Sequence, residues 1–248
     1  MSGLDWLIAR PLAHRGLHDV QKSVIENTPS AFTAAIAERY GIECDLQITA
    51  DGEAMVHHDD ALGRLTEGSG RLDAMTAADL KRIAFKATAD RMITLGELCA
   101  LVAGQATLVI ELKSRFDGDR RLVTRVADVL CGYRGPAAVM SFDPAQVAAL
   151  RELAPRLARG VVAEGRYRQR ERDRLPAATK RAMAYCGHAL RTRPQFIAYA
   201  VRDLPAAIPL VARNAFGIPL LTWTVRSPDD RRKAERYADQ MIFEGFRP

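Results

Sequence analysis

Residues 42–48 read IECDLQI, a mostly apolar segment in which Glu43 and Asp45 stand two positions apart. Side chains on a β-strand alternate between two faces, so both carboxylates share one face, with their Cα atoms about 6.5–7 Å apart. A strand at the edge of a sheet, with its polar face in water, would show the same pattern. In a closed barrel the apolar face packs beneath helices, and the two carboxylates point inward, where they need a counter-charge.

The rest of the chain favours the barrel, because short β-like segments alternate with helical segments from end to end. Eight strands are predicted, at 11–14, 42–48, 108–112, 137–141, 160–163, 196–199, 220–224 and 240–243. Helices are predicted at 29–40, 95–103, 119–131, 144–153, 174–184, 205–216 and 228–237. The length of 248 residues fits one (β/α)8 TIM barrel, and we expect a single domain over residues 1–248.

Three of the predicted helices begin with a capping residue followed by proline. These pairs are Thr28-Pro29, Asp143-Pro144 and Ser227-Pro228. A side-chain oxygen at the first position can accept a hydrogen bond from the first helical turn, and proline at the next position loses no hydrogen bond.

The connection after the second strand is longer than the others. Residues 50–53 predict a tight turn into a returning strand at 54–57. Residues 59–91 then predict a small insertion with a short helix of its own at 76–83.

A third carboxylate is predicted beside the first two. Residues 109–113 read VIELK, so Glu111 and Lys113 share one face of the neighbouring strand. A salt bridge with a purely structural role is the alternative for this pair. If Glu43, Asp45 and Glu111 converge, they form an all-oxygen set that suits Mg2+ or Ca2+ rather than zinc.

Two histidine-containing segments end at the mouth of the predicted barrel, His14-Arg15-Gly16 and His57-His58-Asp59. The guanidinium of Arg15 matches phosphate oxygens, and Gly16 permits a close backbone approach. Two imidazoles, a divalent cation, an arginine and a lysine around one cavity indicate a phosphoester site. There one imidazole takes a proton, and the other gives one to the leaving oxygen.

Short motifs follow one another along nearly the whole chain. They are His14-Arg15-Gly16, Glu26-Asn27-Thr28, Glu43-x-Asp45, His58-Asp59-x-x-Leu62-x-Arg64, Thr94-Leu95-x-Glu97-Leu98, Glu111-x-Lys113, Ser141-Phe142 and Trp223-Thr224-Val225. In this order they resemble the glycerophosphodiester phosphodiesterase family. The resemblance implies a barrel with a small insertion after strand two. It also aligns the family's second histidine with His58, which leaves His57 in a structural role.

The resemblance further implies that a glycerophosphodiester and water give sn-glycerol 3-phosphate and an alcohol. The implied roles are metal ligands for Glu43, Asp45 and Glu111, general base and acid for His14 and His58, and phosphate binding for Arg15 and Lys113. The implied cofactor is Mg2+ or Ca2+. Trp223 is expected to form a wall of the substrate pocket.

The loop at 26–28 has expected roles of its own. Glu26 is expected to contact residues of the metal site without binding the metal itself. Asn27 is expected to fix the loop through backbone hydrogen bonds, and Thr28 to cap a helix.

The sequence departs from the family pattern at a few positions. Arg226 stands where the family often has Asn, and Phe243-Glu244 stands where it usually has Thr-Asp. Leu65 replaces the first Thr of an Arg-Thr-Thr motif. None of these is a predicted metal ligand or catalytic histidine, so the departures bear on the pocket for the leaving group.

The composition is that of an ordinary globular protein, with 48% hydrophobic and 27% charged residues and a formal net charge of +6. The densest basic stretch, 166–174, reads RYRQRERDR and favours a solvated helix or loop of mixed charge. The N-terminal residues are too short and mixed for a signal peptide, and no apolar run approaches the roughly 20 residues of a membrane span. We expect a cytoplasmic protein without a membrane anchor.

Two other functions are alternatives to hydrolysis of a small glycerophosphodiester. A lysophospholipase D-type enzyme would use the same site on lipids, but it needs an apolar entry segment that the sequence does not indicate. A non-catalytic module that binds nucleic acid or another anion would use the basic surface. Carboxylates at its centre would repel phosphate unless a cation were bound, so we expect a small-molecule partner and no nucleic acid.

Overall fold

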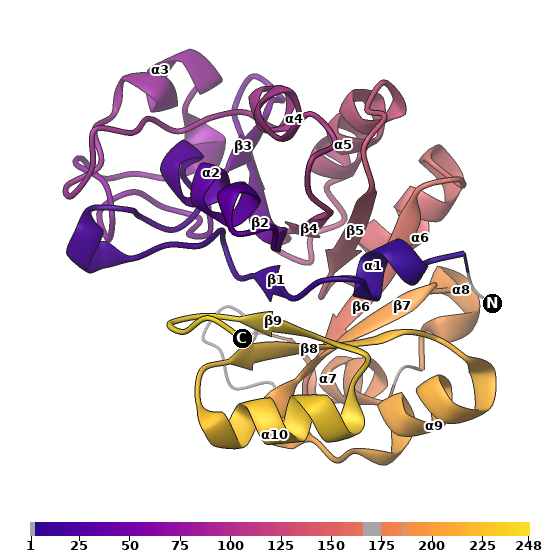
Figure 1. Ribbon diagram of the computed structural model, residues 1–248. Helices are drawn as coiled ribbons and strands as arrows, with labels where there is room; N and C mark the ends of the chain where they lie inside the picture. Colours follow the sequence, from indigo (N-terminus) through magenta and orange to yellow (C-terminus); the bar gives the residue numbers. More distant parts are fainter. Residues whose placement is uncertain (1–2, 166–174, 186) are drawn as a thin grey trace.

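The parallel strands close into a barrel in the computed structural model, which describes residues 3–165, 175–185 and 187–248. The barrel strands are β1 (Leu12–Ala13), β2 (Gly41–Ile48), β4 (Leu108–Leu112), β5 (Ala137–Ser141), β6 (Ala158–Ala163), β7 (Phe196–Ala200), β8 (Leu220–Val225) and β9 (Gln240–Phe243). Each pairs with the next in this order, and β1 pairs with both β2 and β9 (Figure 1). The predicted (β/α)8 TIM barrel is confirmed.

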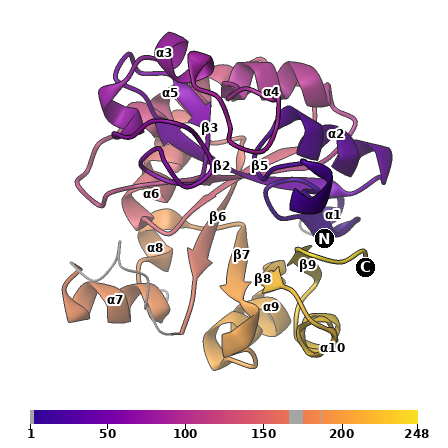
Figure 2. The same ribbon diagram turned by 90° about the vertical axis from the view of Figure 1, so that its left-hand side faces the viewer.

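Helices surround the strands. They are α1 (Asp5–Ile8), α2 (Pro29–Ala37), α3 (Ala77–Arg82), α4 (Leu95–Val102), α5 (Arg121–Cys131), α6 (Pro144–Leu153), α7 (Ala177–Ala184), α8 (Ala189–Thr192), α9 (Ala207–Phe216) and α10 (Pro228–Tyr237), with single 3-10 turns η1 (Val20–Lys22), η2 (Leu72–Ala74) and η4 (Val201–Asp203). Figure 2 shows α2, α4 and α5 on one side of the strands and α9 and α10 on the other. None of the helices in the described ranges is long and apolar enough to cross a bilayer.

The predicted helix ends are correct for α6 and α10 and differ elsewhere by a few residues. The helix predicted at 29–40 ends at Ala37, because Arg39 adopts a left-handed conformation with φ 59°. The helix predicted at 174–184 begins at Ala177, and its predicted first residue lies outside the described residues.

Two of the three predicted helix caps form. Asp143 accepts a hydrogen bond from the backbone N–H of Ala145, and Ser227 accepts one from that of Asp230. The prediction for Thr28 is wrong, because its hydroxyl donates to the carbonyl of Ile25 at 2.8 Å and makes no cap hydrogen bond. This hydroxyl therefore stabilises the turn that precedes α2. Of the predicted pair, only Pro29 has the expected role, as the first residue of the helix.

The alternation along β2 decides which side chains enter the barrel. Ile42, Cys44 and Leu46 are fully buried in a cluster that includes Phe32 of α2 and Leu98 of α4. Side chains at the alternate positions of β2 therefore face the interior, which places Glu43 and Asp45 inside the barrel. Below them, apolar side chains from the other strands fill the interior together with Leu7 of α1.

The insertion follows a hairpin, as predicted. β3 (Ala54–Val56) pairs antiparallel with β2 and carries the chain back alongside Asp45, whose carbonyl accepts from the backbone N–H of His57 at 3.0 Å. Beyond it, η2 and α3 pack Leu72 and Leu80 against Met55 of β3 in a small cluster of their own. The hairpin thus delivers both His57 and His58 to the side of the barrel that carries the carboxylates.

Candidate active site

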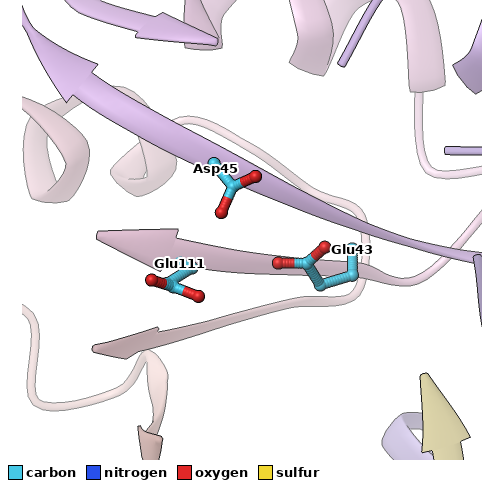
Figure 3. A group of neighbouring side chains, drawn as sticks. All are labelled: Glu43, Asp45 and Glu111. Atoms are coloured by element: carbon cyan, nitrogen blue, oxygen red, sulfur yellow. The ribbon is translucent and has the colours of Figure 1, made fainter. Parts of the chain in front are cut away.

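Three carboxylates converge inside the barrel. Glu43 and Asp45 come from β2, and Glu111 comes from β4, where it is the register partner of Asp45. One ligand oxygen from each lies within 4.8 Å of the others, and the residues are only 2%, 1% and 8% exposed (Figure 3). The structure therefore brings the three predicted metal ligands together.

The chemistry of this donor set fits a hard divalent cation. Two oxygens on opposite sides of one Ca2+ ion are about 5 Å apart, so a spread of 4.8 Å is compatible with a single ion. Burial, together with the charges of Asp45 and Glu111, raises the pKa of Glu43 well above its usual value. Three buried carboxylates without a cation are costly, and an ion held between them would offset that cost.

Lys113 and Arg15 supply the positive charge next to the carboxylates. The Lys113 Nζ lies 2.8 Å from Oδ1 of Asp45 and 2.7 Å from Oε1 of Glu111. The Nε of Arg15 lies 3.2 Å from Oδ2 of Asp45. Burial would raise the pKa of Asp45, but Lys113 and the other neighbouring positive charges lower it well below its usual value. Both predicted phosphate-binding residues therefore border the acidic centre.

Gly16 packs closely against the helix that follows its loop. With φ 81°, it lies so close to α2 that a Cβ atom would meet the Cβ of Ala31 at 2.8 Å. The close backbone approach that glycine permits here is thus to the helix that follows the loop. It fixes the segment that carries His14 and Arg15.

His14 faces the carboxylates from the end of β1. Its Nε2 lies 3.9 Å from Oε2 of Glu43, and its Nδ1 lies 2.7 Å from Oε2 of Glu244. Burial lowers the pKa of His14, although the hydrogen bond to Glu244 opposes the shift. A neutral imidazole near pH 7 can accept a proton, as a general base must.

His58 and His57 are adjacent in sequence but lie in different surroundings. The Nδ1 of His58 lies 2.8 Å from Oδ1 of Asp59, and its ring is about one quarter exposed. His57 is buried, its ring stands 6.4 Å from that of Phe85, and burial lowers its pKa to about 4. Of the two adjacent histidines, His58 is therefore the partly exposed one, and its assignment as the functional histidine stays a prediction.

Glu26 and Asn27 support the site as expected, but through side-chain contacts. The carboxylate of Glu26 accepts from Arg15 and Arg64, in each case at 2.7 Å. The side-chain amide of Asn27 donates to Oδ2 of Asp45 at 2.9 Å, and its carbonyl accepts from the backbone N–H of Asp45 at 3.2 Å. The backbone N–H of Asn27 also donates to the carbonyl of Arg15 at 2.8 Å, so Asn27 fixes the loop through its backbone and Asp45 on β2 through its side chain.

Replacing Glu26 with glutamine should lower the free energy of unfolding by about 1.5–3 kcal/mol at pH 7, the range for hydrogen bonds to charged groups. Burial would raise the pKa of Glu26, but Arg64 and Arg15 lower it to about 2 in the folded protein. Because this is below the unfolded value, the stabilisation is present above about pH 4.5 and is lost as the pH falls toward 2. Urea unfolding of both proteins between pH 7 and 2.5 measures the difference, and a difference that stayed constant would contradict this account.

Trp223 lies on β8 beside the ring of Phe142, with centroids 5.5 Å apart and the planes nearly perpendicular. Its indole Nε1 is buried and has no hydrogen-bond partner within the described part of the chain. An indole N–H is only a donor, and a buried one usually finds an acceptor. The indole therefore carries a donor that no described residue uses, and its expected place in the wall of the substrate pocket stays a prediction.

Two groups of contacting residues were not predicted. Glu244 and Arg226 were noted only as departures from the family pattern, yet Glu244 contacts His14, and Arg226 contacts Glu244 at 2.8 Å. Arg64 contacts Asp59 at 2.6 Å and links it to Glu26. The spacing from His58 to Arg64 within one motif was a signal for the second group. No sequence pattern near Glu244 or Arg226 predicts that these residues contact His14 and each other.

A cavity of about 430 Å3 is lined by Glu111 of the acidic centre and by the neighbouring Lys113. Its lining also includes residues 114–117, Asp143 and Arg71 of the insertion. A small molecule bound at the acidic centre can therefore extend beyond it. The basic stretch at 166–174, which also follows a barrel strand, lies outside the described residues.

The chain was compared with known proteins. The model of the glycerophosphoryl diester phosphodiesterase family matches residues 14–244. A glycerophosphodiester phosphodiesterase of Caldanaerobacter subterraneus is 30% identical over 163 residues, which are 61% of this chain and 65% of that protein. This chain thus aligns with less than two thirds of that relative's length.

Solved structures resemble the fold. A phosphodiesterase from Oleispira antarctica, in complex with its product sn-glycerol 3-phosphate, has a TM-score of 0.75 at 20% identity and covers 94% of this chain and 91% of its own. A glycerophosphodiester phosphodiesterase from Thermotoga maritima has a TM-score of 0.70 at 23% identity, with 94% and 92% coverage. At these identities the likeness supports the barrel fold.

Proposed function

Because this chain belongs to the glycerophosphoryl diester phosphodiesterase family, we propose that it hydrolyses glycerophosphodiesters to sn-glycerol 3-phosphate and an alcohol with the aid of a divalent cation. The observation that carries the proposal is the convergence of Glu43, Asp45 and Glu111 within 4.8 Å. Lys113, Arg15 and His14 border the same centre. The product bound to the Oleispira antarctica enzyme agrees with this substrate class.

Glu43, Asp45 and Glu111 would hold the cation, Mg2+ or Ca2+. When bound, the cation would supply positive charge that stabilises the charge developing on phosphate oxygens. Lys113 and Arg15 would bind the phosphate, because they already lie beside the carboxylates and carry donors that phosphate accepts. The unpartnered N–H of Trp223 would donate to an oxygen of the substrate.

The two histidines would transfer the protons. His14, whose pKa is lowered by burial, would take a proton at Nε2 from the attacking water molecule as general base. His58 would give a proton to the leaving alcohol oxygen as general acid. Asp59 would hold the ring of His58 in place for that transfer, because its carboxylate lies 2.8 Å from Nδ1.

The direct test is an assay for sn-glycerol 3-phosphate released from glycerophosphocholine. We expect turnover with Mg2+ or Ca2+ and none after a chelator has removed the cation. Restoration by one added ion identifies the preferred cation. A purified, folded chain that releases no glycerol 3-phosphate from a panel of glycerophosphodiesters would refute the proposed function.

The substrate is expected to be a small phosphodiester, because Arg15, Lys113 and the cation converge on one phosphate. A nucleic-acid enzyme contacts several successive phosphates and loses affinity steeply with salt. We therefore expect kcat/KM for glycerophosphocholine to fall only modestly, about twofold to threefold, between 50 and 200 mM salt, since one screened phosphate contact is involved. Lysophosphatidylcholine, assayed in parallel, should be cleaved more slowly. A much faster rate on the lysolipid would overturn this substrate assignment and leave the phosphodiesterase chemistry intact.

A further inference from the structure

Three neighbouring strand ends place a histidine, a carboxylate and a guanidinium in a row. His14 follows β1, Glu244 follows β9 and Arg226 follows β8, and these strands are adjacent in the barrel. The backbone N–H of His14 donates to the carbonyl of Phe243 at 2.9 Å, and that of Glu244 donates to the carbonyl of Val225 at 3.0 Å. The backbones of His14 and Glu244 are thus tied to the barrel, and Arg226 directly follows the last residue of β8.

The side chains make a continuous chain of contacts. Oε2 of Glu244 lies 2.7 Å from Nδ1 of His14 and 2.8 Å from Nη2 of Arg226. The other carboxylate oxygen lies 4.0 Å from Nε2 of His18, a buried nitrogen without a hydrogen-bond partner among the described residues. Among these groups Arg226 is the permanent cation, and it contacts the same oxygen as His14.

From this geometry we propose that Glu244 is a positioning residue for His14 and that Arg226 holds Glu244 in the required place. This inference rests on the proposed role of His14 as general base. An ionised carboxylate only accepts hydrogen bonds, so it selects the tautomer of His14 with its proton on Nδ1. The lone pair of the imidazole is then on Nε2, the nitrogen that lies 3.9 Å from Glu43 and faces the acidic centre.

Arg226 has a separate part in this arrangement. A glutamate side chain has several rotatable bonds, and Glu244 is about one quarter exposed. The contact with Arg226 restricts the carboxylate of Glu244 to one position. Arg226 and His14 contact the same oxygen of that carboxylate, Oε2. Arg226 should therefore act on turnover only through Glu244.

Glu244→Gln is the decisive change, because an amide can donate to Nδ1 and then favours the wrong tautomer. We expect kcat for glycerophosphocholine to fall on the order of 10–100-fold, as for partners that orient a functional histidine, while KM changes less than about twofold. Glu244→Asp should restore part of the loss. Long-range 1H–15N NMR of the imidazole should show the Nδ1–H tautomer of His14 in the wild type and its loss in Glu244→Gln.

A double-mutant cycle tests Arg226. Arg226→Met should lower kcat about threefold to tenfold in the wild type, less than the loss of the orienting carboxylate itself, and have no effect in the Glu244→Ala background. Arg231→Met is the matched control, because Arg231 is similarly exposed, 44% against 56%, and pairs with Glu235 at the same 2.8 Å. The control should keep full activity. Unfolding by urea shows whether each variant is folded.

The outcomes separate this inference from the proposed function. If Glu244→Gln keeps both kcat and the tautomer of His14, the positioning role is wrong. If Arg226→Met has the same effect with and without Glu244, Arg226 acts elsewhere and its part of the inference is wrong. If the wild type shows no turnover but the tautomer depends on Glu244, the positioning role stands and the proposed function fails.

Discussion

Replacing His14 or His58 with alanine is expected to lower kcat for glycerophosphocholine on the order of 10²–10⁴-fold, the range for one lost proton-transfer group. Burial lowers the pKa of His14, and its Nε2 lies 3.9 Å from Oε2 of Glu43. His58 is partly exposed beside Asp59. The assay tests the proposed roles of general base for His14 and general acid for His58.

His57→Ala is the control for this prediction, because His57 adjoins His58 in sequence but is buried against Phe85. It should lower the stability of the protein and leave kcat of the folded fraction nearly unchanged. Circular dichroism and urea unfolding give the folded fraction at the assay temperature. Equal losses of kcat from His57→Ala and His58→Ala would show that the two histidines were assigned in the wrong order.

Removing one metal ligand is the second large change. We expect Asp45→Asn to lower kcat/KM on the order of 10²–10⁴-fold, since a cation contributes several kcal/mol and about 1.4 kcal/mol corresponds to a factor of ten. Asp45 is the central residue, because Arg15, Lys113 and Asn27 all contact its carboxylate. The variant should bind phosphate-bearing ligands poorly even when it is folded.

Isothermal titration with MgCl2 and CaCl2 measures the binding directly, without reference to turnover. We expect one divalent ion per wild-type chain and no binding to Asp45→Asn or Glu111→Gln. Asp119→Asn is a matched control, because Asp119 lines the adjoining cavity but pairs with Arg121 at 2.8 Å and is not one of the three ligands. A wild-type chain that bound neither ion, or that kept its activity in a chelator, would contradict the metal site.

The barrel and its acidic centre could be predicted because their signals are local. Alternation by two along 42–48 places Glu43 and Asp45 on one face, and the same rule applies to Glu111 and Lys113. In the register of β2 with β4, Asp45 lies opposite Glu111, so both side chains point into the barrel. The ends of the strands and helices were less certain, because single residues such as Arg39 end them through left-handed conformations.

The loop at 26–28 shows where local reasoning was incomplete. The motif indicated that Glu26, Asn27 and Thr28 matter, but their partners come from distant segments. Asn27 contacts Asp45, 18 residues away, and Glu26 contacts Arg64, 38 residues away. A short polar side chain can cap a helix, bind its own loop or reach another strand, and only the folded chain decides among these.

The sequence by itself determined the barrel, the three carboxylates and the two histidines at its mouth, because periodicity and short motifs depend on neighbouring residues. The tertiary structure alone decided how His14 is oriented. His14 and Glu244 are 230 residues apart, and they meet because β1 pairs with β9 when the barrel closes. Closure is a property of the whole chain, so a contact across it leaves no pattern in the sequence on either side.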